Sequence, residues 1–237
     1  MAGKSVALVT GAGSGIGKSA SPALLKDGYH VALVGRRKDL LEKTAAESGA
    51  KDRALVLAAD ITKDAEVEAI FAQLKKSFGR LDVLFNNAGI GAPAVPMEDL
   101  PIEKFREVGN INLVAMFMCT QHAIRIMKAQ DPKGGRIINN GSISAHAPRP
   151  MSVDYTSTKH AVTGLTDCIP LDGRKNDITA SQIDIGNALT ELAARMANGV
   201  PQADGSIKPE PLMDVKHVGD AVLQMANLPL DVNVQFM

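Results

Sequence analysis

The chain has 237 residues, of which 45% are hydrophobic and 22% charged, so it carries enough apolar material for a sizeable globular core. Its 26 Lys and Arg residues balance 26 Asp and Glu residues, and no net charge recruits nucleic acid or an anionic membrane. We therefore expect no nucleic-acid partner. We also expect no membrane association, because no segment approaches the ~20 apolar residues of a membrane span.

The cysteines and histidines predict neither disulfides nor a metal site. Cys119 and Cys168 lie far apart and form no CxxC pair, and the first residues lack the long apolar run of a secretory signal. This predicts a reducing, cytoplasmic location. The five histidines show no metal-ligand spacing, so no metal is expected.

The first strand runs into a glycine-rich turn. Residues 5–10 are short, apolar and β-branched, which predicts a buried strand, and Gly11-Ala-Gly-Ser-Gly15-Ile-Gly17 leads from it into a helix over residues 18–27. Glycines permit a tight turn and close backbone approach, while a helix N-terminus attracts a pyrophosphate. Pro22 falls inside this helix, where it is expected to remove a hydrogen bond and cause a kink.

The second strand, over residues 30–35, ends in Gly35 and is followed at once by Arg36 and Arg37. In a dinucleotide-binding unit an acidic residue at this strand end binds the ribose 2′-hydroxyl of NAD, whereas arginine pairs with the 2′-phosphate of NADP. The arginines therefore favour NADP. The alternative is that they simply start the surface helix predicted over residues 38–48.

Strands continue to alternate with helices along the rest of the chain, without linkers or repeats. This alternation predicts an α/β fold: one Rossmann-type domain over residues 1–237, with a doubly wound parallel sheet of about seven strands and helices on both faces. The remaining strands are expected over residues 53–58, 81–85, 136–140, 178–183 and 232–237, and the remaining helices over 64–78, 101–127, 154–173 and 215–225.

Polar motifs gather at the carboxyl ends of these strands, where open α/β sheets bind ligands. Asp60, the run from Asn86 to Gly89 and the run from Gly141 to Ala145 all follow strands. Asn112 lies within the long helix among apolar neighbours. A buried amide needs partners, and the sequence leaves open whether another helix or a water molecule provides them.

Tyr155 and Lys159 are four residues apart at the start of a predicted helix, so they share one face. A phenol ionises too weakly near neutral pH to act as a base unless a positive charge favours the phenolate. The spacing therefore predicts a proton-handling pair, although it also occurs by chance on solvated helices.

Residues 188–211 carry glycines and prolines and show no regular periodicity. An irregular stretch of this kind beside a ligand site predicts a lid over the substrate. It contains few aromatic or charged anchors, which favours a small, rather apolar ligand.

These motifs together resemble the short-chain dehydrogenase/reductase family over essentially the whole chain. Thr10 to Gly17 is similar to the cofactor motif TGxxxGxG, Asn86 to Gly89 is similar to NNAG, and Ser142 precedes Tyr155 by the thirteen residues of the family's active site. One difference is Ile185-Gly186, where the family has Pro-Gly.

The resemblance implies a mechanism. Tyr155 would be the general acid in carbonyl reduction and the general base in alcohol oxidation, with Lys159 favouring its ionised form and holding the nicotinamide ribose. Ser142, preferred to Ser144 on spacing, would donate a hydrogen bond to the substrate oxygen, and Asn112 would hold a water for proton relay.

The same resemblance implies a binding site for NADP, with NAD possible, and a homodimer or homotetramer. The function expected is interconversion of a carbonyl and a secondary alcohol by hydride transfer. The alternatives are a non-catalytic cofactor-binding relative and an NAD-dependent alcohol or sugar dehydrogenase. The residues expected to bind the cofactor are Gly11, Ser14, Gly15, Ile16, Gly17, Arg36, Arg37, Asp60, Ile61, Asn87, Ala88, Gly89, Tyr155, Lys159, Ile185, Gly186 and Thr190.

Overall fold

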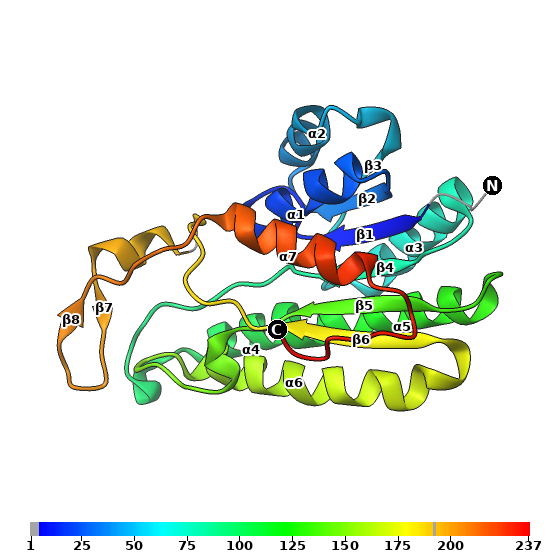
Figure 1. Ribbon diagram of the computed structural model, residues 1–237. Coiled ribbons are helices and arrows are strands. Elements are labelled where there is room, and N and C mark those ends of the chain that lie inside the picture. The colour runs from blue at the N-terminus through cyan, green and yellow to red at the C-terminus, as the bar shows by residue number, and fades with distance from the viewer. Residues whose placement is uncertain (1–4, 192) are drawn as a thin grey trace.

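A computed structural model describes residues 5–191 and 193–237. Its centre is a six-stranded parallel sheet with strand order β3-β2-β1-β4-β5-β6 (Figure 1). The chain winds outward from β1 in both directions, which confirms the predicted doubly wound α/β fold. The strands are β1 (Val6–Thr10), β2 (His30–Gly35), β3 (Ala54–Ala58), β4 (Val83–Asn86), β5 (Gly135–Asn140) and β6 (Ile178–Ile183).

Helices cover both faces of the sheet because strand residues alternate between the two sides. Ala7 and Val9 of β1 pack in one apolar cluster with α1, α2 and α7, whereas Val6 and Leu8 pack in the other with α3, α5 and α6. The helices are α1 (Gly15–Lys26), α2 (Lys38–Glu47), α3 (Asp64–Phe78), α4 (Ile102–Gly109), α5 (Ala115–Ala129), α6 (Val153–Gly173) and α7 (Val215–Asn227).

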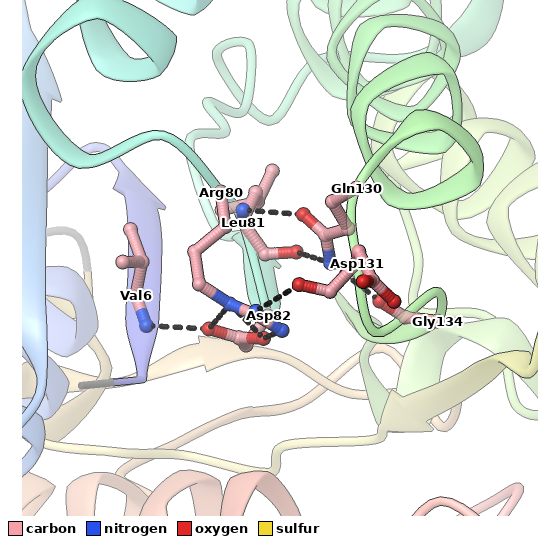
Figure 2. A network of polar contacts seen from close by, with 7 residues as sticks. All are labelled: Val6, Arg80, Leu81, Asp82, Gln130, Asp131 and Gly134. Atoms are coloured by element: carbon pink, nitrogen blue, oxygen red, sulfur yellow. Dashed lines mark hydrogen bonds and ion pairs between the residues drawn. The ribbon is translucent and has the colours of Figure 1, made fainter. Parts of the chain in front are cut away.

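A polar network fixes the amino ends of β1 and β4 (Figure 2). The Asp82 carboxylate accepts the Val6 N–H at 2.8 Å and pairs with Arg80 at 2.7 Å. The Gln130 side chain bonds both the N–H of Leu81, at 2.9 Å, and its carbonyl, at 3.0 Å. These contacts set the register of the central strands, so that their carboxyl ends meet at the opposite edge.

The predicted final strand over residues 232–237 is not a regular strand, so the sheet has six strands rather than about seven. Phe236 forms a single parallel bridge with Gln182, and Met237 donates its N–H to the Gln182 carbonyl at 2.9 Å. The segment occupies the edge beside β6 without a continuous ladder. Its last residues still bond to β6 and the residue after it: the Gln182 N–H donates to the Gln235 carbonyl at 2.7 Å and the Asp184 N–H to the Met237 carbonyl at 2.6 Å. Upstream, the Asn233 side chain bonds Arg136 and the Ala180 carbonyl.

Helix boundaries differ from the predictions in two places, whereas α6 ends where predicted. The first helix begins within the glycine turn, at Gly15, and runs through Pro22 to Lys26. The long helix predicted over residues 101–127 is divided into α4, a π-helical turn over Asn110–Val114, and α5. Helix α6 continues through Pro170 to Gly173, the predicted stop.

The irregular segment before α7 contains a two-stranded hairpin that the sequence analysis did not predict. Its strands are β7 (Val200–Pro201) and β8 (Ile207–Lys208), and Figure 1 shows the hairpin projecting beyond the carboxyl ends of the sheet. A bridge between Ala188 and Met213 closes the base of the segment. Within residues 5–191 and 193–237, no helix combines the length and apolarity needed to cross a membrane.

Candidate active site

A cavity of about 810 Å³ lies at the carboxyl ends of the strands. It extends from the glycine turn after β1, past the end of β4, to the first turn of α6. The cavity brings together most of the residues expected from the sequence. Those lining it are Gly11, Ser14, Gly15, Ile16, Arg36, Arg37, Asp60, Ile61, Asn87, Ala88, Gly89, Ser142, Tyr155, Lys159, Ile185, Gly186 and Thr190.

Two expected residues are not among those that line the cavity. Gly17 is buried, and a Cβ atom there would lie 2.3 Å from the Gly11 carbonyl oxygen and 2.6 Å from Asn87 Nδ2. Its role is therefore to let α1 pack against the turn. Asn112 is also buried, in the π-helical turn behind the cavity wall.

The glycine turn is held against the segment after β4. Gly11 and Gly15 have φ angles of 68° and 51°, values that side chains disfavour. Thr10 Oγ1 accepts the N–H groups of Asn87 and Ala88 at 2.9 and 3.0 Å, and Asn87 Nδ2 donates to the Thr10 carbonyl at 2.9 Å. The start of α1 thus opens onto a rigid, glycine-lined part of the cavity, which suits a pyrophosphate.

Charged residues surround the far end of the cavity, beyond β2 and β3. Both Arg36 and Arg37 precede α2, and Arg37 Nη2 donates to Ser14 Oγ at 3.3 Å. Burial opposes ionisation of Asp60, but hydrogen bonds from Thr62 and the charge of Arg36 hold the pKa of Asp60 below its usual range. The carboxylate is thus an acceptor fixed by Thr62 and near the charge of Arg36.

Lys159 and Tyr155 lie one turn apart on α6, as predicted. The Lys159 side chain is buried, and its Nζ donates to the Asn140 carbonyl at 2.6 Å and lies 5.3 Å from the centre of the Tyr155 ring. Tyr155 is half-buried and lines the cavity. The positive charge is therefore fixed beside the phenol and shielded from solvent.

Ser142 follows β5 and lies on the same cavity wall. Its Oγ accepts the N–H of Ser144 at 3.1 Å, and its own N–H donates to Asp184 Oδ1 at 3.0 Å. Because Ser144 occupies one lone pair of the hydroxyl, the hydroxyl proton is directed elsewhere and is suited to an oxygen in the cavity. Ser144, the other candidate, also lines the cavity and contacts Ser142 through its backbone.

Asn112 uses its side chain on protein groups. Its Oδ1 accepts the Ile90 N–H at 2.9 Å, and its Nδ2 donates to the Ile90 carbonyl at 2.9 Å and to Thr158 Oγ1 at 3.2 Å. The amide therefore ties the segment after β4 to α6. The sequence left open whether another helix or a water molecule provides the partners of this amide. The structure shows protein partners, one of them Thr158 on α6.

A polar cluster at the cavity mouth is not evident from the sequence. Arg149 makes two bonds to Glu210, at 2.6 and 2.7 Å, and Glu210 also accepts from Asn187 at 2.6 Å and from Gln202 at 3.0 Å. The bonds from Arg149 and Gln202 lower the pKa of Glu210 to about 2. No spacing reveals this cluster, because its members come from separate loops.

The cavity fits a nicotinamide dinucleotide. Its length runs from two arginines, past a glycine turn at a helix N-terminus, to a tyrosine and a buried lysine. Its polar groups include hydrogen-bond acceptors such as Asp60 for sugar hydroxyls and cations for phosphate groups. In contrast, no group of three or more His, Cys, Asp or Glu residues in the described ranges is arranged to hold a metal ion.

Comparison with known proteins agrees with this geometry. The short chain dehydrogenase family profile matches residues 5–200. The chain is 34% identical over 195 residues to a 2,5-dichloro-2,5-cyclohexadiene-1,4-diol dehydrogenase of Sphingobium indicum. The aligned region covers 82% of this chain and 76% of that relative.

Two solved structures are similar over nearly their whole length. One is a 3-ketoacyl-(acyl-carrier-protein) reductase from Brucella melitensis complexed with NADH, with 28% identity and a TM-score of 0.88, covering 100% of this chain and 96% of the other. The second is an alcohol dehydrogenase from Thermococcus sibiricus complexed with 5-hydroxy-NADP, with 27% identity and a TM-score of 0.84, covering 99% and 95%.

The chain belongs to the short-chain dehydrogenase family. It is an oxidoreductase that uses a nicotinamide cofactor to interconvert carbonyl and alcohol groups. The family assignment predicted from the motifs is thus confirmed.

Gly17→Ala tests the packing of the glycine turn. The added methyl group meets the Gly11 carbonyl, so we expect a loss of about 1–3 kcal/mol in the free energy of unfolding. Cofactor affinity should fall as well, because the turn moves. Denaturant unfolding and fluorescence titration with NADPH measure the two effects.

Gly109→Ala is the matched control, since nothing lies within 4 Å of the added atom. It ends α4 with an ordinary helical φ and should be neutral or slightly stabilising. Equal losses from the two substitutions would contradict the packing role of Gly17.

Proposed function

We propose that the protein reduces a small, apolar carbonyl compound with NADPH, and that Tyr155 is the acid and base of the reaction. The observation that carries this proposal is that Tyr155, Lys159 and Ser142 share one cavity with the glycine turn and Arg36. A protein that only binds the cofactor would need no such convergence of proton-handling groups.

Each of these residues has a separate task. Ser142 directs its hydroxyl proton at the substrate oxygen, where negative charge develops. Tyr155 gives its proton to that oxygen in the reductive direction and removes it in the oxidative direction. Lys159 stabilises the resulting phenolate and is held in place by the Asn140 carbonyl. The nicotinamide supplies or accepts the hydride when bound.

Asn112 is expected to hold a water that relays a proton back to Tyr155, and this role stays a prediction. Its side-chain amide already bonds Ile90 and Thr158, so a relay water would be held by other atoms of this turn. The amide bonds keep the helix turn and α6 at a fixed separation, which such a relay requires.

The proposed preference for NADP depends on Arg36 and Arg37. Both side chains are exposed at the cavity edge, next to a strand that ends in Gly35 without an acidic residue. A guanidinium binds a phosphate with charge-assisted hydrogen bonds. An acidic residue after β2 would instead repel the 2′-phosphate of NADP.

The substrate end of the cavity supports an apolar substrate. Ile90, Met151, Met196 and Val200 line it, and the last two belong to the segment over residues 188–211. We propose that this segment is the lid, fastened by the pair of Arg149 and Glu210. Closing it would exclude water from the reacting groups.

We further propose that the protein is a cytoplasmic homodimer or homotetramer. Large apolar side chains are exposed at Phe105 of α4, at Val114 of the π-helical turn and at Phe117 of α5. A second copy of the chain would bury them.

Tyr155→Phe should lower kcat by about 10²–10⁴, since it removes the group that transfers the proton. Cofactor affinity should stay unchanged, because the aromatic ring and Lys159 remain. The measurements are steady-state turnover of a ketone panel, followed by cofactor absorbance, and fluorescence titration with NADPH. Tyr29→Phe, at the chain's other tyrosine, serves as the control and should keep its turnover. Full activity of the Tyr155 variant would remove that residue from its role.

Arg36→Ala should weaken NADPH binding about tenfold or more, because a hydrogen bond to a charged group contributes ~1.5–3 kcal/mol. NADH binding should change little. The two dissociation constants are measured by nicotinamide fluorescence, with Lys38→Ala as the control at the neighbouring exposed cation. A parallel loss for both cofactors would show that Arg36 acts only on the fold, and a wild-type preference for NADH would favour the NAD-dependent alternative.

Arg149→Met should loosen the lid. Since the pKa of Glu210 lies at about 2, below its ordinary 4.5, the pair's stabilisation is fully present above about pH 4.5 and is lost as the pH falls towards 2. At neutral pH we expect faster proteolysis between residues 200 and 208 and a higher KM for the ketone. Lys208→Met, which removes an exposed pair with Asp204, is the control. An unchanged cleavage rate in the Arg149 variant would contradict the fastening role.

A further inference from the structure

A chain of buried polar side chains crosses the sheet beneath the cavity, from β4 through β5 and α6 to β6. Asn86 Nδ2 donates to Asn139 Oδ1 at 3.0 Å, and Asn139 Nδ2 donates to Thr166 Oγ1 at 2.9 Å. Thr166 Oγ1 donates to Gln182 Oε1 at 3.1 Å, and Gln182 Nε2 donates to Asp184 Oδ1 at 2.8 Å. The first four of these side chains are at most 2% exposed.

The chain has a direction, and Asp184 sets it. A carboxylate only accepts hydrogen bonds, so Gln182 must present its nitrogen to Asp184 and its oxygen to Thr166. The Thr166 hydroxyl shares its one proton between Gln182 Oε1 and the Val162 carbonyl, which lies 2.9 Å away. Asn139 must therefore present its nitrogen to Thr166 and its oxygen to Asn86. The unmatched atom lies at that far end: Asn86 Oδ1 is buried and has no hydrogen-bond partner among the described residues.

The Asp184 end of the chain reaches the backbone of the proposed active site. Beyond β5, the N–H groups of Gly141 and Ile143 donate to the carbonyls of Ile183 and Ile185 at 2.9 and 3.3 Å. The N–H between them, that of Ser142, points away from these carbonyls. It needs another acceptor, because Ser142 is only 6% exposed.

That acceptor is Asp184 Oδ1, which lies 3.0 Å from Ser142 N. The carboxylate lies directly against Gly141, where a Cβ atom would be 2.1 Å from Oδ1. Only glycine at this position leaves room for the bond. The second oxygen, Oδ2, contacts the exposed ring of His146 at 2.8 Å, so it is not part of the buried chain.

We propose that Asp184 is a positioning residue for Ser142. Its carboxylate fixes the serine backbone, and the buried chain fixes the carboxylate, so that the Ser142 hydroxyl proton is aimed at the substrate oxygen before the substrate arrives. Such preorganised donors cost no rearrangement when charge develops. This inference rests on the proposed function, in which Ser142 is that donor.

The test compares Asp184→Ala with Asp184→Asn, which keeps an acceptor oxygen for Ser142 N and Gln182. We expect the alanine variant to lose about 10- to 100-fold in kcat on the best ketone of the panel, short of the ~10²–10³ that complete loss of such a donor costs. The asparagine variant should recover most of this rate. Affinity for NADPH should stay the same in both.

Two further measurements separate positioning from a general loss of structure. In a Ser142→Ala background, Asp184→Ala should cost almost nothing more, because its effect acts through the serine. Amide hydrogen exchange over residues 141–147, read by mass spectrometry without cofactor or substrate, should speed up in Asp184→Ala and not in Asp184→Asn. His146→Ala removes only the exposed partner and should match the wild type.

The proposal would be overturned if Asp184→Ala lowered kcat by the same factor in the wild type and in the Ser142→Ala background. Unchanged amide exchange over residues 141–147 in Asp184→Ala would overturn it as well. A His146→Ala variant as impaired as Asp184→Ala would transfer the role to the histidine and also overturn it. If the wild type reduces no ketone, the proposed function fails by itself, and the exchange data still report whether Asp184 holds Ser142.

Discussion

The candidate active site depends on the contact between the end of β1 and the segment after β4. These two strands are neighbours only because the strand order reverses its winding at β1, and that reversal leaves a crevice at the carboxyl edge. Thr10 Oγ1 joins the two segments by accepting two successive N–H groups, those of Asn87 and Ala88. These bonds fix the position of the glycine turn relative to the segment after β4.

This contact also connects the glycine turn with the part of the cavity around Lys159. Asn87 bonds the Thr10 carbonyl through Nδ2 and accepts from Asn140 Nδ2 at 2.9 Å through Oδ1. The Asn140 carbonyl in turn accepts from the Lys159 ammonium. One series of hydrogen bonds therefore runs from the glycine turn to Lys159 of the proposed proton-handling pair. A buried ammonium is stable only where such acceptors are already in place, and this one is held beside the Tyr155 ring.

Much of this arrangement could be predicted from the sequence, because it depends on local patterns. Apolar β-branched runs, the glycine turn and the Tyr155–Lys159 spacing are read over a few residues, and strand ends converge in any parallel sheet. The rest depends on pairings between distant residues: Asp184 with Ser142, 42 positions apart, and Arg149 with Glu210, 61 apart. The contact between Asn233 and Arg136, 97 positions apart, is likewise invisible to periodicity.

The most direct test of the account is to follow the hydride itself. NADPH carrying deuterium at C4 of the nicotinamide, in each of its two stereochemical forms, is incubated with the protein and a panel of small apolar ketones. Mass spectrometry of the alcohol should find one deuterium on the carbinol carbon from one of the two forms. If the cofactor binds but no alcohol carries deuterium from either form, the cavity does not reduce small apolar ketones with NADPH.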